Sequence, residues 1–121
     1  MGKVASHRDL IVWQKAMDLA VLCYELVEVF PKAEQYRMVS QLTRAAASVP
    51  ANIAEGHARS STREYLHFLS IAKGSLMEME TFIMLATRLK YLSSADAEPA
   101  LGLISEISKM LTAIRGKLRR A

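Results

Sequence analysis

The sequence predicts an all-α protein, an antiparallel up-down-up-down bundle of four helices. Apolar residues recur three and four positions apart through most of the 121 residues, and no segment shows the strict alternation of a β-strand. Short connections between the expected helices favour antiparallel neighbours. Because 51% of the residues are hydrophobic, the chain has material for one core. We therefore expect residues 1–121 to form a single domain, with a frayed basic N-terminus at 1–8 and a basic C-terminal tail at 115–121.

The first helix is expected from about Asp9 to Phe30, where Pro31 ends it. It carries two neighbouring apolar stripes: Leu10, Trp13, Met17, Ala20, Tyr24 and Val27 form the first, and Val12, Ala16, Leu19, Cys23, Leu26 and Phe30 the second. At about 100° per residue the two stripes cover roughly half of the helix circumference. A helix that contributes a single seam to a bundle needs a narrower apolar surface than this. We therefore expect one side of the helix to be buried inside the monomer and the other side to be buried against another copy.

The second helix is expected from about Glu34 to Ala58, with Gly56 and the small polar residues after it loosening the chain. Its core face holds Met38, Leu42, Val49 and Ile53. A polar stripe comprises Arg37, Gln41, Arg44, Ser48, Asn52, Glu55 and Arg59, and an alanine strip comprises Ala47, Ala51, Ala54 and Ala58. The polar stripe suits either solvent or a subunit interface, whereas the alanine strip lets a neighbouring backbone approach closely.

Pro50 lies in the middle of this second helix. Proline in a helix interior costs about 3 kcal/mol or more, because it removes a hydrogen bond and clashes with the preceding turn. On a helical wheel Pro50 falls beyond the core face, and the Ala46 carbonyl that it leaves free is within reach of Ser48, Asn52 or water. We expect a kink at Pro50 that bends the alanine strip around a neighbouring subunit; the alternative is a tolerated irregularity.

The third helix is predicted from a capping box, Ser61 followed by Glu64, and runs to about Leu92. Its expected core residues are Tyr65, Phe68, Leu69, Ala72, Leu76, Met79, Phe82, Ile83, Ala86 and Leu89. The fourth helix begins either at Ser94 or at Pro99, a residue favoured in the first helical position. Its seam is Leu101, Ile104, Ile107, Leu111, Ile114 and Leu118, repeating at three and four residues as in a coiled coil.

Few residues point to catalysis or to a bound cofactor. Cys23 is the only cysteine, which fits a reducing cytoplasm and excludes a disulfide framework. Glu64 and His67 form one Glu-x-x-His pair, but a di-metal bundle site needs a second pair and none exists. The most apolar run, 21–30, contains Glu25 and Glu28 and is too short to span a bilayer. We therefore expect no enzyme, no metal, no cofactor and no membrane partner.

Positive charge is concentrated in two regions. The formal net charge is +4, with a pI near 9.4. The candidate phosphate-binding residues lie on the second helix, in the loop after it and near the C-terminus: Arg37, Arg44, Arg59, Arg63, Lys109, Arg115, Lys117, Arg119 and Arg120. Clusters of cations neutralise phosphates, and an oligomer carries one such cluster for each of its subunits. Alternatively, the C-terminal cations complement the carbonyl end of the last helix.

Five segments carry a family resemblance: DLIVWQKA at 9–16, FP at 30–31, QLTRA at 41–45, SVPANIAEG at 48–56 and FLSIAKGSL at 68–76. Over residues 7–118 the chain resembles the four-helix-bundle proteins encoded within intervening sequences of 23S ribosomal RNA. Arg44, Asn52 and Glu55 match the motif of that family. The family commonly has an aromatic residue, a glycine and an arginine after SVPANIAEG, whereas His57, Ala58 and Arg59 stand here.

The resemblance implies a small bacterial cytoplasmic protein that assembles into a ring-shaped homopentamer and has no established enzymatic activity. The family is also similar in fold to the accessory proteins of diversity-generating retroelements, which are basic pentamers that bind nucleic acid and a reverse transcriptase. We therefore expect a non-catalytic oligomer that binds RNA or DNA through a pooled basic surface. The alternative is a protein-interaction scaffold that recruits a polypeptide partner and has no direct nucleic-acid role.

Overall fold

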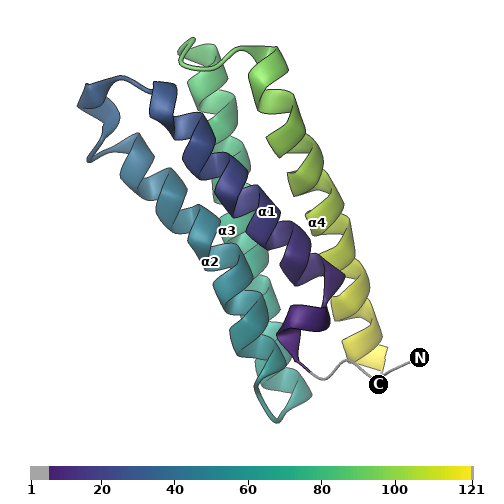
Figure 1. Ribbon diagram of the computed structural model, residues 1–121. Helices are drawn as coiled ribbons and strands as arrows, with labels where there is room; N and C mark the ends of the chain where they lie inside the picture. The colour runs from purple at the N-terminus through teal and green to yellow at the C-terminus, as the bar shows by residue number, and fades with distance from the viewer. Residues whose placement is uncertain (1–5, 121) are drawn as a thin grey trace.

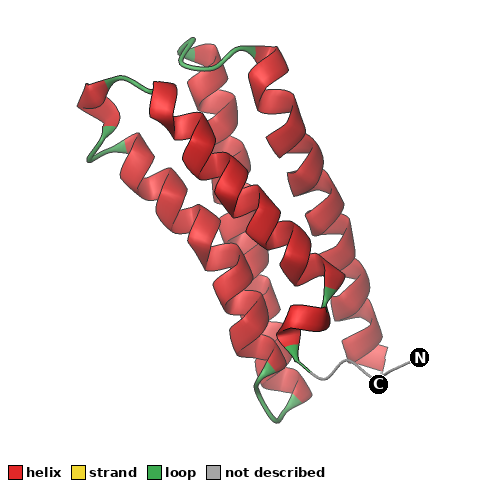
Figure 2. Cartoon of the chain, in the orientation of Figure 1, coloured by secondary structure: helices red, strands yellow, loops and turns green. Residues whose placement is uncertain are grey.

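The structure is a computed structural model that describes residues 6–120. Within these residues every regular element is helical, as Figure 2 shows, so the predicted all-α class with four helices is confirmed. The four long helices are α1 (Ile11–Leu26), α2 (Met38–His57), α3 (Thr62–Arg88) and α4 (Ser94–Arg120). Three single-turn 3-10 helices accompany them: η1 (His7–Asp9), η2 (Val27–Val29) and η3 (Lys32–Glu34).

Consecutive long helices run in opposite directions (Figure 1). α1 packs against α2 and α4, and α3 packs against the same two helices, so α1 and α3 occupy diagonal corners. The face formed by α1 and α2 is therefore opposite the face formed by α3 and α4. One end of the bundle holds η1, the α2–α3 connection and the last turns of α4, whereas the α1–α2 and α3–α4 connections lie at the other end.

Each helix contributes one buried apolar row to a single core. Fully buried members are Val12, Leu19 and Cys23 on α1, Leu42, Val49 and Ile53 on α2, Leu69, Leu76 and Ile83 on α3, and Ile104, Ile107 and Leu111 on α4. The second predicted stripe of the first helix is the one that faces this core. Its neighbour remains partly outside, because Met17 is 41% exposed and Tyr24 is 52% exposed.

The connections are more structured than the sequence predicted. α1 ends at Leu26 and α2 begins at Met38, and η2 and η3 lie between them. Glu34 was expected inside a helix, but its carboxylate instead accepts a hydrogen bond from the Tyr91 hydroxyl at 2.8 Å, which joins the two connections at this end. The Phe30 ring packs against Tyr91 with ring centroids 5.4 Å apart.

α3 ends at Arg88, four residues before the predicted Leu92. Lys90 adopts the left-handed conformation with φ 66°, and the Tyr91 N–H donates to the Ala86 carbonyl at 2.9 Å. This is a Schellman ending without its usual glycine, so no glycine marks the end of this helix in the sequence. Leu89 therefore caps the helix and is 47% exposed, so its predicted place in the core is wrong.

Pro50 lies within an α2 that is continuous from Met38 to His57. Its side chain is buried, and it lines a groove together with Trp13, Met17 and Ala20 of α1. Asn52 donates to the Ser48 carbonyl at 2.8 Å and not to the Ala46 carbonyl. The kink at Pro50 stays a prediction.

Candidate nucleic-acid interface

The segments η1, the α2–α3 connection and the last turns of α4 meet at one end of the bundle (Figure 1), and all three carry cations. We call this surface the basic end. Its exposed members are Arg8, Arg59, Arg63, Lys117, Arg119 and Arg120, with the half-buried Arg115 beside them. Three segments that are far apart in sequence therefore supply one charged surface. At the opposite end, acids and bases are mixed: Glu25, Glu28, Glu34, Asp96 and Glu98 accompany Lys32, Arg37, Arg88 and Lys90.

The carboxylates at the basic end are engaged locally. Asp9 accepts a hydrogen bond from the Ser6 backbone N–H at 3.3 Å, and Glu64 accepts one from the Ser61 hydroxyl at 3.1 Å. Glu55, in the last turn of α2, forms an ion pair with Arg59, which lies just after the end of that helix. The remaining exposed cations form no salt bridge to any of residues 6–120: Arg8, Arg63, Lys117, Arg119 and Arg120. They are therefore available to an external anion.

The α2–α3 connection is held at its start by Gly56 and at its end by Ser61. A Cβ placed on Gly56 would lie 2.9 Å from the Phe68 Cβ, so glycine is needed here for the close approach of α2 and α3. Gly56 does not loosen the chain as its sequence context predicts, because α2 continues through it to His57. The Arg59 guanidinium lies 4.8 Å from the centre of the Phe68 ring, which fixes this cation against the bundle.

Ser61 caps α3, as the sequence predicted. Its hydroxyl accepts a hydrogen bond from the Glu64 backbone N–H at 3.1 Å. The reciprocal bond differs from the expected capping box, because the Glu64 carboxylate accepts from the Ser61 hydroxyl and not from the Ser61 backbone. This cap sets the position of Arg63, in the first turn of α3, relative to Arg59.

The C-terminal cations lie on a helix, since α4 continues to Arg120. Arg115 is half buried, and its Nε has no hydrogen-bond partner among the described residues. The side chains of Lys117, Arg119 and Arg120 are exposed. The N-terminal region predicted to fray includes residues 1–5, which lie outside the described residues, while His7–Asp9 form η1 with Ser6 as its cap.

Three predicted phosphate ligands lie away from the basic end. Arg37 is the residue before α2, at the opposite end of the bundle, and a helix of about 20 residues separates it from Arg59 by roughly 30 Å. Arg44 lines a polar groove of about 340 Å³ between α2 and α3, together with Gln41, Ala45, Ser48, Ser75 and Glu78. Lys109 is exposed in the middle of α4. The structure therefore does not join these three cations to the others.

The polar stripe of α2 is divided between two environments. Ser48 and Asn52 are half buried: the Asn52 amide donates to the Ser48 hydroxyl at 2.9 Å, and the Ser75 hydroxyl of α3 donates to the same oxygen at 2.8 Å. These two residues therefore form a contact within the monomer, which differs from the two environments predicted for the stripe, solvent and a subunit interface. Arg44 and Glu55 are exposed.

The alanine strip borders an apolar groove of about 420 Å³ between α2 and α1. Ala47 and Ala51 are exposed, Ala54 is half buried, and Pro50 forms the floor. The α1 side of the groove is lined by Trp13, Met17 and Ala20, with His7 of η1 at one end. Ala58, the fourth member of the strip, is exposed after the end of α2 and does not line the groove.

Other reactive groups are dispersed or inaccessible. In the part of the chain that the structure describes, no three His, Cys, Asp or Glu residues lie close enough to hold a metal ion. Burial raises the pKa of the Cys23 thiol to about 12, which keeps it protonated at neutral pH. None of the helices formed by residues 6–120 combines the length and the apolar character that a bilayer crossing needs.

These features define a class: a four-helix bundle with charge concentrated at one end and apolar surface left exposed along α1. The family model for the 23S rRNA-intervening sequence protein matches residues 8–113, so the chain belongs to that family. It is similar to a crystal structure of a protein of unknown function from the S23 ribosomal protein family of Bacteroides thetaiotaomicron. The identity is 26% and the TM-score 0.78, over 87% of this chain and 98% of that one. No curated protein matches the chain.

Proposed function

We propose that this protein is a non-catalytic oligomer that binds RNA or DNA through its basic end. The observation that carries the proposal is the convergence of Arg59 and Arg63 from one connection with Lys117, Arg119 and Arg120 from the end of α4. Arg59 is already paired with Glu55, but Arg63 and the three cations of α4 have no carboxylate partner among the described residues and would bind phosphates without losing an ion pair. The name of the family, which refers to an intervening sequence of 23S rRNA, is consistent with an RNA partner.

Assembly is the second part of the proposal. One monomer offers few cations, whereas several copies with their basic ends side by side offer a multiple of that number. The exposed apolar surface of α1 and the alanine strip supply faces that association can bury. The family resemblance favours a homopentamer in a bacterial cytoplasm.

Binding of a structured RNA, measured by fluorescence anisotropy at increasing salt, tests the nucleic-acid role. Affinity should fall steeply between about 50 and about 200 mM salt. Replacing Lys117, Arg119 and Arg120 with serine should weaken binding and reduce the slope of log K against log salt by roughly 2 to 3 per protomer engaged. A matched control replaces Lys32, Arg37 and Lys90, at the other end of the bundle, with serine and changes the net charge equally.

The control should retain the binding and salt slope of the wild-type protein. Equal loss of affinity in both triple variants would show that net charge, and not the basic end, determines binding. No binding by the wild-type protein even at low salt would favour the second candidate, a scaffold for a polypeptide partner. The exposed apolar residues of α1 are the feature that supports this alternative.

A further inference from the structure

The polar groove between α2 and α3 is lined by two side chains of opposite charge that do not pair with each other. Arg44 of α2 and Glu78 of α3 are both exposed, and neither forms a salt bridge with any of residues 6–120. The groove has a volume of about 340 Å³. Ligand pockets have volumes of about 300 to about 1,000 Å³, so this groove, near the lower limit, fits a small molecule.

Two serines fix the level at which the two charges lie. The hydroxyls of Ser48 and Ser75 are 2.8 Å apart and mark a point where α2 and α3 meet. Arg44 lies one turn before Ser48, about 6 Å back along α2. Glu78 lies three residues after Ser75, about 4.5 Å further along α3. Because the two helices are antiparallel (Figure 1), both steps lead in the same direction, and Arg44 and Glu78 are level on opposite walls of the groove.

One serine hydroxyl proton in this groove has no acceptor in the described part of the chain. The Ser48 hydroxyl accepts hydrogen bonds from the Asn52 amide at 2.9 Å and from the Ser75 hydroxyl at 2.8 Å, which occupies both of its lone pairs. Its own proton is then left over. If the bond between the serines is reversed, the Ser75 proton is left over instead, so the count does not depend on which serine donates.

Other hydroxyls on the helices donate this proton to their own backbone. Thr43, Thr81 and Thr87 each donate to the carbonyl four residues earlier, at 2.7 to 2.9 Å. Ser48 and Ser75 form no such bond within residues 6–120, and both are half buried beneath the exposed charged residues. The groove therefore offers a hydroxyl proton to an external acceptor.

The two walls of the groove differ in what they can bind. The α2 wall holds the Arg44 guanidinium, which has only donors, and the Gln41 amide, whereas Glu78 on the α3 wall has only acceptors. A carboxylate fits between the guanidinium and the free hydroxyl proton, and an ammonium group fits beside Glu78. A phosphate group, with its greater negative charge, is repelled more strongly by Glu78.

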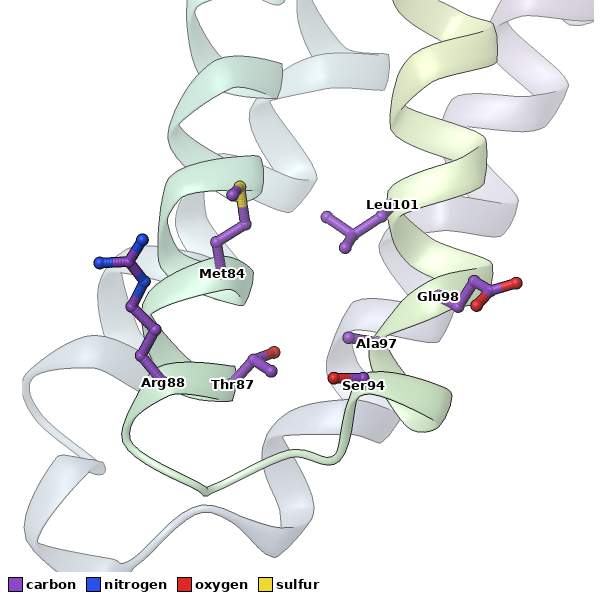
Figure 3. A pocket seen from close by; sticks show the side chains of 7 residues that line it. All are labelled: Met84, Thr87, Arg88, Ser94, Ala97, Glu98 and Leu101. Carbon is purple, nitrogen blue, oxygen red and sulfur yellow. The ribbon is translucent and has the colours of Figure 1, made fainter.

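A hollow between α3 and α4 differs from the polar groove in the direction of its charged side chains. It has a similar volume, about 360 Å³, and is lined by Arg88 on α3 and Glu98 on α4. Figure 3 shows that these two side chains extend away from each other, whereas Leu101 points towards α3. The centre of this hollow is therefore apolar, and it provides an internal comparison for the polar groove.

We propose that the polar groove is a binding site for a small zwitterion of the α-amino acid class. The ligand's carboxylate bonds to Arg44 and to the free hydroxyl of the Ser48–Ser75 pair, and its ammonium group pairs with Glu78. Ala45 contributes only a small side chain to the lining, which leaves room for the side chain of the ligand. This site lies away from the basic end and depends neither on nucleic acid nor on assembly.

Three probe molecules that differ by one charged group test the proposal. They are L-alanine, propionate, which lacks the ammonium group, and ethylammonium, which lacks the carboxylate. Each is titrated into the isotope-labelled full chain at neutral pH, and the backbone amide shifts are followed by NMR. L-alanine should shift the amides of the polar groove with a dissociation constant at least about tenfold lower than that of either other probe, because it alone makes both charged contacts. Amides around Leu101 should not shift.

Two substitutions separate the roles of the two walls. Arg44→Gln should weaken L-alanine binding at least about tenfold and leave ethylammonium binding unchanged. Glu78→Gln should also weaken L-alanine binding, but it should strengthen propionate binding, because the repelling carboxylate is gone. The matched controls are Arg63→Gln and Glu98→Gln, which make the same changes at exposed residues outside the groove. Both should bind L-alanine as the wild-type protein does.

Propionate or ethylammonium that binds as tightly as L-alanine would overturn the proposal, since one wall would then be sufficient. No shift of the groove amides with any probe would also overturn it, because Arg44 and Glu78 would then neutralise each other. Equal losses in Arg44→Gln and Arg63→Gln would show a general effect of charge and contradict the site. The titrations contain no nucleic acid, so loss of RNA binding contradicts only the proposed function, and loss of L-alanine binding contradicts only this site.

Discussion

Gly56→Ala should destabilise the protein, although alanine is the better helix former. The new Cβ would lie 2.9 Å from the Phe68 Cβ and 3.3 Å from the Tyr65 carbonyl oxygen. Both atoms belong to or adjoin the α3 backbone and cannot rotate away. α2 and α3 would therefore have to move apart at Gly56.

Two opposing free-energy terms set the size of the effect. Replacing glycine with alanine inside a helix gains at most about 1 kcal/mol. Overpacking a tight contact costs about 1 to 3 kcal/mol, and rigid neighbours place this site in the upper part of that range. The net loss in the free energy of unfolding is then about 1 to 2 kcal/mol, which lowers the melting temperature by several degrees for a domain of this size.

Thermal unfolding followed by circular dichroism measures the difference at a fixed protein concentration, because assembly contributes to the apparent stability. The matched control is Gly102→Ala on α4, where a new Cβ would meet nothing within 4 Å. It should stabilise the protein by about 0.5 to 1 kcal/mol. If Gly56→Ala stabilises the protein as much as Gly102→Ala does, the steric explanation for Gly56 is refuted.

Three further predictions concern assembly and the core. Ala51→Leu should fill the apolar groove between α1 and α2 and reduce the size of the oligomer in size-exclusion chromatography; elution at the wild-type volume would argue against this face. Pro50→Ala should straighten α2 and weaken assembly, and unchanged oligomer size and stability would leave the kink without a role. Cys23 should react with a disulfide reagent at neutral pH only as fast as the protein unfolds, since burial raises its thiol pKa to about 12; rapid labelling of the folded protein would contradict its inaccessibility.

The helices could be predicted because their apolar spacing is a local property of the sequence. Val12, Leu19 and Cys23 repeat at helical spacing, and the same residues form the α1 side of the core. Their exact ends could not be predicted. The last turn of α3 closes through Lys90 in a left-handed conformation that lysine seldom adopts, and the start of α2 is displaced because Glu34 bonds to a tyrosine 57 positions away.

The candidate site was predictable in composition but not in arrangement. Periodicity could place Arg37, Arg44 and Arg59 on one stripe, and the rise of a helix separates its ends by roughly 30 Å. It could not indicate which end of the stripe the last turns of α4 would join. Ser48 and Asn52 looked like solvated or interfacial residues, because the partner hydroxyl, Ser75, lies on another helix. Arg8 was missed, since only the fold brings η1 to the basic end.

The molar mass of the protein in dilute solution, measured by multi-angle light scattering, tests the central claim most directly. Association through exposed apolar faces predicts a defined multiple of the 13.5 kDa chain, fivefold if the family resemblance holds. A single mass of 13.5 kDa at all concentrations would contradict the proposed oligomer and the basic surface that its copies pool.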